Sequence, residues 1–66
     1  MLYLAHLKVN KFYYEGKTTT SEQFHIVDAE SETEVETKVI KYYYEKNDPY
    51  YVSYSVEFLN INEIIY

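Results

Sequence analysis

The chain of 66 residues contains no cysteine, no arginine and no tryptophan, and only one glycine and one proline. Without cysteine it can form neither a disulfide framework nor a zinc site with thiolate ligands. A single glycine excludes the glycine-rich loops that hold phosphate groups. No apolar run approaches the roughly 20 residues of a membrane-spanning helix, and no signal-peptide pattern is present, so we expect neither a membrane span nor secretion.

Positive charge is also scarce. Eleven acidic residues face six lysines, which gives a formal net charge of −5. Proteins that bind duplex DNA gain affinity by neutralising phosphates with Lys and Arg, and arginine is the commonest bidentate reader of guanine. The sequence therefore disfavours binding to duplex DNA. An acidic surface keeps a small protein soluble and steers it toward a basic protein partner.

The short length limits how much surface folding can bury. A chain of this size buries only about 60% of the surface that its unfolded state exposes. We therefore predict one α+β domain over residues 1–66, with a stability that association with a partner would raise.

Two strand-like segments surround the glycine and predict a β-hairpin. Residues 2–14 alternate between two faces, and residues 18–27 are rich in β-branched side chains. A two-residue loop at Glu15-Gly16 makes the apolar faces of the two strands coincide. Because glutamate disfavours positive φ, a longer loop with a bulge at Gly16 is the alternative. The two-residue loop gives this apolar face: Tyr3, Ala5, Leu7, Val9, Phe24 and Ile26.

The next segment predicts a helix that begins after residues 28–31. Ser31-Glu32-Thr33-Glu34 is a capping box, in which Ser31 accepts from the amide of Glu34 and Glu34 reaches back to the amide of Ser31. Acidic residues precede lysines along this segment, as the helix dipole favours. Asn47 and Pro49 end the helix. The apolar stripe is predicted to contain Val35, Val39, Tyr42 and Tyr43, widened by Ile40 and Tyr44.

Residues 50–59 carry the clearest strand pattern, with Tyr50, Val52, Tyr54, Val56 and Phe58 on one face. Residues 60–66 fit either a short helical turn or an extended tail. The element order is then β-β-α-β. A right-handed crossover predicts an α+β fold with a three-stranded antiparallel sheet of order 2-1-3 and the helix on one face.

The other face of this sheet has no cover, and its composition is mixed. A partly apolar open face on so small a domain favours association, and we expect a homodimer formed by sheet stacking or edge pairing. The alternative is a monomer whose C-terminal segment folds over the face. The apolar residues expected there are Leu2, Leu4, Phe12, Val27, Tyr51 and Leu59.

The two-residue hairpin loop also places His6 directly opposite His25 on the open face, with Cβ atoms about 5 Å apart. Two imidazoles at this distance can hold a metal ion if a carboxylate such as Glu57 joins them, or can act as a pH switch. A solvated structural pair is the simplest interpretation. We therefore assign no metal site and no cofactor, and keep His6 and His25 as the one candidate pair.

Signs of catalysis are missing. The acidic run 28–32 does not continue as an EF-hand loop, since Thr33 and Val39 stand where that loop requires Gly and Glu. There is no cysteine, and Ser53 and Ser55 lie within a predicted strand and not on a strained turn. One helix on three strands offers little room for a catalytic cleft. We expect a protein that is not an enzyme.

Ten tyrosines are more than this core needs. Tyrosine provides a large contact area at low entropic cost and is enriched at binding hot spots. The surplus tyrosines therefore favour contact with a protein partner. Stacking on a nucleotide or on single-stranded nucleic acid, and a structural oligomer such as a virion component, are the alternatives. The candidate partner-binding residues are Tyr13, Tyr14, Tyr44, Tyr50, Tyr51 and Tyr66.

Two short motifs carry a resemblance to known proteins. Val27-Asp28-Ala29 is followed by Ser31 and Glu34, and Val56 is followed by Ile61 and Glu63-Ile64. In these motifs the chain resembles a family of small uncharacterised proteins, a domain of unknown function from gut Bacteroidota and their phages. The resemblance implies the strand-helix-strand order and a phage context. In that setting we expect a phage or mobile-element accessory protein, in the cytoplasm of a bacterial host, that inhibits a host or defence protein.

Overall fold

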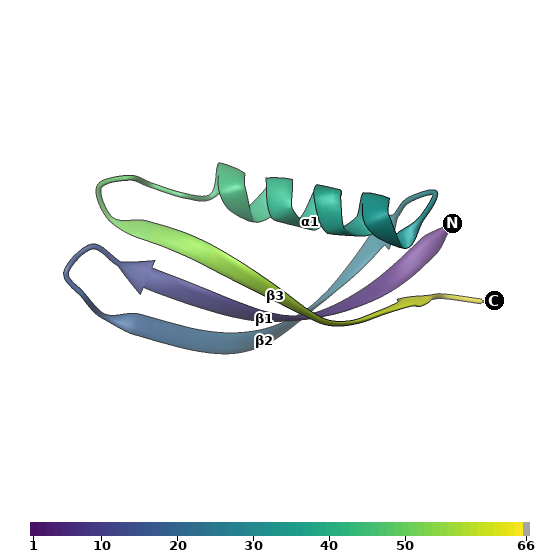
Figure 1. Cartoon of the computed structure of the whole chain (residues 1–66), viewed down its shortest axis with the longest axis horizontal. Helices are drawn as coiled ribbons and strands as arrows, with labels where there is room; N and C mark the ends of the chain where they lie inside the picture. The colour runs from purple at the N-terminus through teal and green to yellow at the C-terminus, as the bar shows by residue number, and fades with distance from the viewer. Residues whose placement is uncertain (66) are drawn as a thin grey trace.

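Three antiparallel strands and one helix make up the part of the chain that the computed structural model describes, residues 1–65. The elements are β1 (Leu2–Tyr13), β2 (Thr18–Asp28), α1 (Glu32–Glu45) and β3 (Val52–Glu63). The sheet has the order β2-β1-β3, and α1 lies on one of its faces (Figure 1). This confirms the predicted β-β-α-β arrangement.

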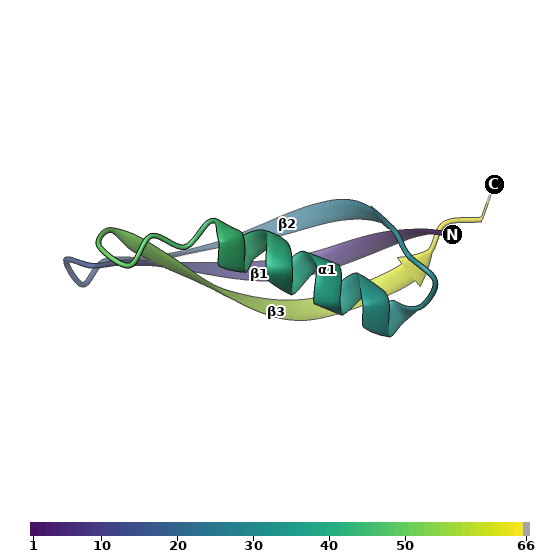
Figure 2. The same cartoon turned by 90° about the horizontal axis from the view of Figure 1, so that it is seen from above.

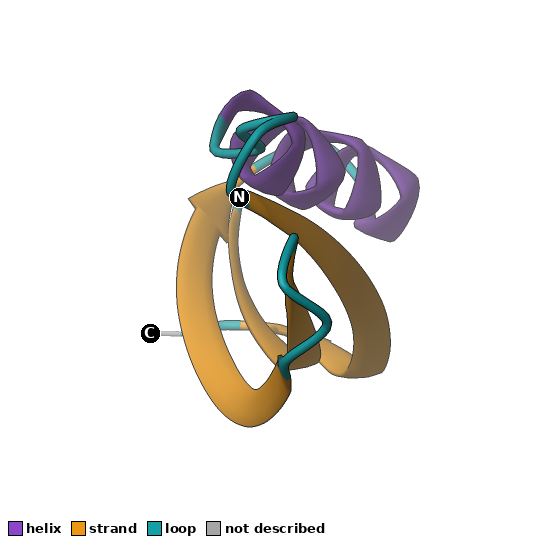
Figure 3. Ribbon diagram, turned by 90° about the vertical axis from the view of Figure 1, so that its left-hand side faces the viewer, coloured by secondary structure: helices purple, strands orange, loops and turns teal. Residues whose placement is uncertain are grey.

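The molecule is elongated, with extents of 44 × 18 × 15 Å. Strands of 11 to 12 residues at about 3.3 Å per residue account for the long axis. The helix of 14 residues spans only about 21 Å, so it covers part of the twisted sheet (Figures 2 and 3). The β1–β2 loop and the α1–β3 connection lie together at the end of the sheet that extends beyond the helix (Figure 1). We call this end, residues 11–17 and 45–51, the tip.

The hairpin loop has three residues, Tyr14–Gly16, and not the two that we expected. Tyr13 donates its N–H to the carbonyl of Lys17 (2.7 Å), and Gly16 donates to the carbonyl of Tyr13 (2.9 Å). Gly16 adopts a φ of 97°, which glycine reaches without the steric cost of a side chain. The alternative of a longer loop with Gly16 at the irregular position is therefore correct.

The longer loop shifts the register of β2 by one residue relative to the prediction. Phe24 pairs with His6 and His25 pairs with Ala5. Because side chains alternate between faces, a shift of one residue exchanges the two faces of the whole strand. Phe24 and Ile26, which we placed in the core, are 63% and 68% exposed. That prediction is wrong for both residues.

The helix begins as its capping signal indicates, with one changed partner. The side chain of Ser31 accepts from the amide of Glu34 (3.3 Å). The Glu34 carboxylate accepts from the amide of Glu30 (3.1 Å), one residue before the expected one, and also pairs with Lys38 (3.1 Å). The Ser31 side chain thus gives the amide of Glu34 a partner that the helix itself does not provide. The Glu34 carboxylate in turn holds the amide of Glu30, just before the first turn.

The buried stripe of α1 is narrower than predicted. Val35, Val39 and Tyr43 are buried, whereas Tyr42 and Ile40 are exposed. Relative to Val39 in the middle of the stripe, Val35 and Tyr43 lie about 40° to either side, but Tyr42 lies about 60° away and Ile40 about 100°. A sheet of three strands contacts only the central part of this arc. The expectation of Tyr42 as a core residue is therefore wrong.

Strand β3 starts at Val52, two residues later than predicted, and extends to Glu63. Ile64 then donates its N–H to the carbonyl of Leu2 (2.8 Å), so the tail is extended and the helical-turn alternative is wrong. Opposite the step from His6 to Leu7, β3 contains one residue more than β1. This bulge moves the inward face of β3 from even-numbered to odd-numbered residues.

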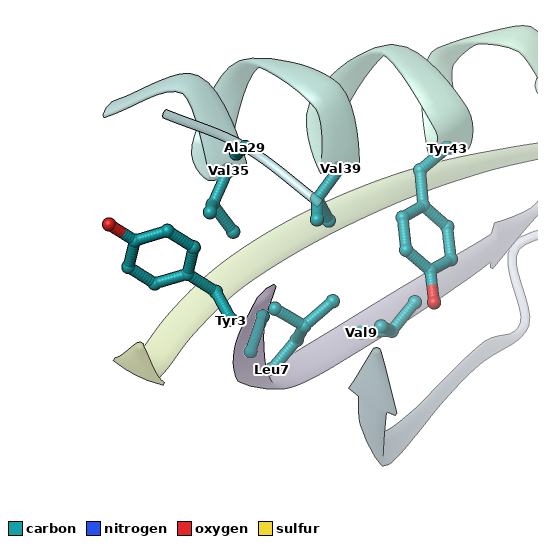
Figure 4. Packing of buried hydrophobic residues seen from close by; sticks show 8 residues of the cluster. Tyr3, Leu7, Val9, Ala29, Val35, Val39 and Tyr43 are labelled. Carbon is teal, nitrogen blue, oxygen red and sulfur yellow. The ribbon is translucent and has the colours of Figure 1, made fainter. Parts of the chain in front are cut away.

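The core lies between α1 and the face of the sheet that α1 covers (Figure 4). Leu7 and Val35 are its largest fully buried side chains. Because of the bulge, Phe58 and Ile61 both pack against this core, although their spacing is odd. The buried cluster consists of Tyr3, Ala5, Leu7, Val9, Ala29, Val35, Val39 and Tyr43.

The opposite face of the sheet has no helix over it in residues 1–65, and we call it the open face (Figure 3). One half of it is apolar, because Leu2, Leu4 and Ile26 share this face with the Phe24 ring. The other half is polar except for Phe12, which lies on the open face as we expected. Val27 and Tyr51, which we expected here, lie elsewhere: Val27 packs against the core, and Tyr51 precedes β3. The polar half contains Lys8, Asn10, Thr20, Glu22, Ser55 and Glu57.

Candidate interaction surfaces

The two histidines do not form a pair. His6 lies on the open face opposite Phe24, and His25 lies on the helix-facing side opposite Ala5. A sheet therefore separates the two imidazoles, and the candidate metal pair and the paired pH switch are both wrong. Within residues 1–65, no three His, Asp or Glu side chains are grouped so that they could hold a metal ion.

On the open face, His6 stacks on its cross-strand neighbour. The rings of His6 and Phe24 are nearly parallel, at 9°, with centroids 4.3 Å apart. Nε2 of His6 lies 3.3 Å from a carboxylate oxygen of Glu22, without the alignment of a hydrogen bond. The imidazole therefore packs with the Phe24 ring at the edge of the apolar half of the open face.

Under the helix, His25 is held by tyrosines. Its Nε2 lies 2.7 Å from the hydroxyl of Tyr43, and the rings of Tyr42 and Tyr43 both approach it at 5.5 Å edge-on. Burial lowers the pKa of His25 below its ordinary value, and the positive charge of Lys46 adds to this effect. Burial raises the pKa of Tyr43. Burial and Lys46 thus disfavour the imidazolium form, and the contact between His25 and Tyr43 ties β2 to α1.

Four of the predicted partner-binding residues come together at the tip: Tyr13, Tyr14, Tyr50 and Tyr51. The backbone N–H of Tyr14 donates to the carbonyl of Tyr51 (2.9 Å), which joins the two loops. Tyr14, Tyr50 and Tyr51 are 82%, 76% and 71% exposed. Tyr13 is half-buried beneath the ammonium of Lys11, 5.1 Å from its ring centre.

The connection that carries Tyr50 and Tyr51 is a hydrogen-bonded turn built on Asp48. Asp48 and Val52 exchange two backbone hydrogen bonds of 2.8 and 2.9 Å. The Asp48 carboxylate accepts from the amide of Tyr50 (2.9 Å), and its carbonyl accepts from the amide of Tyr51 (3.1 Å). These bonds fix the backbone from which the two tyrosine rings project.

The tip has two adjoining shallow hollows that share Tyr13 and Tyr14 as a common wall. The larger, of about 320 Å³, is completed by Glu15, Tyr50 and Tyr51. The smaller, of about 130 Å³, is lined by seven residues. Those seven are Phe12, Tyr13, Tyr14, Asp48, Pro49, Val52 and Ser53.

Two of the six candidate tyrosines do not belong to this cluster. Tyr44 is 73% exposed but lies on α1, beside Ile40 and Asn47 and over β3. Tyr66 lies outside the described residues. The sequence analysis also missed that Phe24 and Ile26 form a surface. The signal for that surface was the alternative of a longer loop with a bulge at Gly16, which exchanges the two faces of β2.

The net negative charge of the protein lies outside the tip, where four of the tyrosines cluster. The tip contains three acidic residues and three lysines, so its formal charge is zero. The other residues carry eight acidic residues and three lysines, which is the whole net charge of −5. Five of those acids fall within residues 28–36, around the start of α1 at the other end of the molecule (Figure 1). The tip is therefore an aromatic and electrically balanced surface.

Comparison with protein-family models, with curated proteins and with solved structures finds no match for this chain. The resemblance to the Bacteroidota and phage family stays a prediction. Among residues 1–65, no helix has the length and apolar character needed to cross a bilayer.

Proposed function

We propose that the protein is a non-enzymatic interaction module that binds a protein partner through the tip. The observation that carries this proposal is the cluster of three strongly exposed tyrosines on two loops joined by the Tyr14–Tyr51 hydrogen bond. Folding does not need these rings, because the core lies under α1. Exposed aromatic rings on a fixed backbone reduce the entropic cost of binding.

The biological setting of this module is a further part of the proposal. A phage or mobile-element accessory protein that inhibits a host or defence protein agrees with the small size, the acidity and the family resemblance. The acidic residues at 28–36 would then increase the rate of encounter with a basic partner, while the neutral tip makes the contact.

A pull-down from host lysate at low salt tests this proposal. We expect the wild-type protein to retain a stoichiometric partner and the variant Tyr14→Ser/Tyr50→Ser to lose it. Tyr44→Ser is the matched control, because Tyr44 is equally exposed but lies away from the tip. Equal recovery with the wild type and the tip variant would contradict the role of the tip. Recovery of no partner by any form would contradict the proposal as a whole.

We further propose that two copies associate through the open face. Phe24 and Ile26 are exposed there beside the half-buried Leu4, and an exposed apolar patch on so small a domain favours association. Three strands of about 40 Å cover on the order of 550 Å² in projection. This is below the value of about 800 Å² per partner for a standard interface, so an occupant has to cover the face along its whole length, as a second copy related by a twofold axis would do.

Sedimentation over a range of concentrations tests the dimer. We expect the mass to rise from about 8.0 kDa toward twice that value as concentration increases. Ile26→Glu should keep the protein monomeric, whereas Ile40→Glu, an exposed isoleucine on α1, should not change the association. A monomer at all concentrations would contradict the dimer and leave the role of the tip standing.

A further inference from the structure

We infer that the tip binds a proline-rich segment of its partner in the polyproline II conformation. This inference rests on the proposed function and names the class of partner for the same surface. It follows from the shape of the hollows, the chemistry of their walls and the contacts of two of the three lysines of the tip, Lys11 and Lys46.

The shape of the tip favours an extended chain over a compact ligand. Two shallow hollows of about 320 and 130 Å³ lie side by side and share the wall of Tyr13 and Tyr14. A small-molecule site is typically a single cleft of roughly 300–1,000 Å³ that encloses most of its ligand. A polyproline II helix repeats every three residues, about 9 Å, so ridges at positions i and i+3 can enter neighbouring hollows.

The walls of the hollows suit proline in particular. The tyrosine rings offer flat apolar faces to pyrrolidine rings, and their hydroxyls can donate hydrogen bonds. A polyproline II segment has no internal hydrogen bonds, so its carbonyl groups are free to accept them. Such a segment is also extended before it binds, which lowers the entropic cost of association.

Two of the three lysines of the tip lie against tyrosine rings of the protein itself, which disfavours a nucleic-acid strand. Lys11 lies over the rings of Tyr13 and Tyr54, at 5.1 and 5.6 Å. Lys46 lies over the ring of Tyr42 at 4.6 Å. Both ammonium groups are therefore directed to the protein's own aromatic rings, and a phosphate backbone would have to compete for them.

Glu15 gives the larger hollow a carboxylate at its margin. The Asp48 carboxylate of the smaller hollow already accepts the amide of Tyr50, whereas Glu15 projects from an exposed turn. A basic residue next to the prolines would pair with Glu15 at the surface. We therefore expect a preference for proline-rich segments that carry an arginine or a lysine, of the modest size that exposed ion pairs provide.

Titration of the full chain with defined probes tests this inference. The probes are decaproline, decaproline with one terminal arginine, a ten-residue Gly-Ser peptide and the oligonucleotide dT10, followed by two-dimensional NMR. We expect saturable binding of both proline peptides, with shifted amides confined to the tip, and no binding of the Gly-Ser peptide. Tyr14→Ala and Tyr50→Ala should each weaken binding about tenfold, and Tyr44→Ala should leave it unchanged. Glu15→Gln should remove only the preference for the arginine-bearing peptide.

The same experiment separates this inference from the proposed function. If neither proline peptide binds, yet the pull-down partner is lost from the tip variant, the inference is overturned and the interaction module stands. Binding of dT10 in place of the proline peptides, or proline binding that survives both tyrosine variants, would also overturn it. The amide spectrum of each variant shows whether its fold is intact. We expect it to be intact, because the side chains of Tyr14 and Tyr50 are exposed and the hydrogen bonds of the two loops are made by the backbone.

Discussion

Nε2 of His25 and the hydroxyl of Tyr43 lie 2.7 Å apart, and this contact joins β2 to α1 at the margin of the core. The two residues meet because the three-residue hairpin loop turns His25 toward the helix. The contact therefore depends both on the register of the hairpin and on the position of α1. It also places a titratable group where protonation acts on the packing of the helix.

Loss of the Tyr43 hydroxyl should weaken the fold by a measurable amount. In Tyr43→Phe the ring still fills its place in the core, but Nε2 of His25 loses its partner in a partly buried site. We expect a decrease of about 1 kcal/mol in the free energy of unfolding, measured by urea denaturation. Tyr44→Phe, on the exposed side of α1, should change it by less than about 0.5 kcal/mol. Equal effects of the two substitutions would contradict the hydrogen bond.

The lowered pKa of His25 predicts a pH dependence of stability. The unfolded chain binds a proton at His25 more readily than the folded chain does, since burial and Lys46 disfavour the imidazolium. The contribution is therefore complete above the ordinary value of 6.5 and is lost as the pH falls below it toward the pKa of the folded state. Urea midpoints measured between pH 7.5 and pH 5 should decrease.

The substitution His25→Gln isolates this group, because an amide can still bond to the Tyr43 hydroxyl but does not titrate. We expect the decrease in urea midpoint between pH 7 and pH 5 to become smaller in this variant. An unchanged slope would show that another group is responsible.

The carboxylate of Glu34 should contribute in a lower pH range. Its hydrogen bond from the amide of Glu30 and its pairing with Lys38 lower its pKa. Stability from this group is present above the ordinary value of 4.5 and is lost as the pH falls below it. Glu34→Gln should therefore reduce thermal stability at pH 7 and bring it closer to the wild type at pH 3. Glu36→Gln, on the same helix, is the control, and a difference that persists at pH 3 would contradict the prediction.

The hairpin loop should tolerate substitution at Glu15 but not at Gly16. Nothing lies within 4 Å of a Cβ atom added to Gly16, so space is not the limit, but its φ of 97° strains any other residue. We expect Gly16→Ala to cost about 1 kcal/mol in urea denaturation and Glu15→Ala less than about 0.5 kcal/mol. A neutral Gly16→Ala would show that the loop can adopt another conformation.

The narrow stripe of α1 predicts unequal effects of two aliphatic truncations on one helix. Val35 is fully buried, whereas Ile40 is exposed. Val35→Ala should lower the free energy of unfolding by about 1–3 kcal/mol, because it removes buried methyl groups and leaves a cavity. Ile40→Ala removes more atoms but should cost less than about 0.5 kcal/mol. A larger cost for Ile40→Ala than for Val35→Ala would contradict the exposure of Ile40 in the structure.

Local patterns were sufficient to predict the elements and their order. The alternation in residues 2–14, the capping residues Ser31 and Glu34, and the stop at Asn47 and Pro49 each act within a few residues. The surplus of tyrosine beyond the needs of one small core was likewise visible from composition. The elements depend on backbone geometry and on side chains a few residues apart, and the tyrosine surplus depends on composition alone. Both can be read from the sequence.

Register could not be predicted in the same way. The two hairpin loops differ by one residue, and each gives an alternating strand, so the pattern of β2 fits either face. The two-residue loop aligned Phe24 and Ile26 with the apolar face of β1, and we chose it on the assumption that both residues are buried. Both are exposed, so the choice was wrong. The bulge in β3 could not be predicted from the sequence either. It is an extra residue relative to the partner strand β1, and it turns Ile61 toward the core only through the pairing of β3 with β1.

The sequence by itself determined the β-β-α-β order, the capped helix and an aromatic, acidic composition. Only the tertiary structure decided that His6 and His25 lie on opposite faces, that four tyrosines meet at the tip, and that five of the eleven acidic residues lie at the other end. The reason is that secondary structure arises from contacts a few residues apart, whereas a surface is made of residues distant in the chain. Tyr14 and Tyr51 are joined by one backbone hydrogen bond, and that bond exists only once the sheet has brought the two loops together.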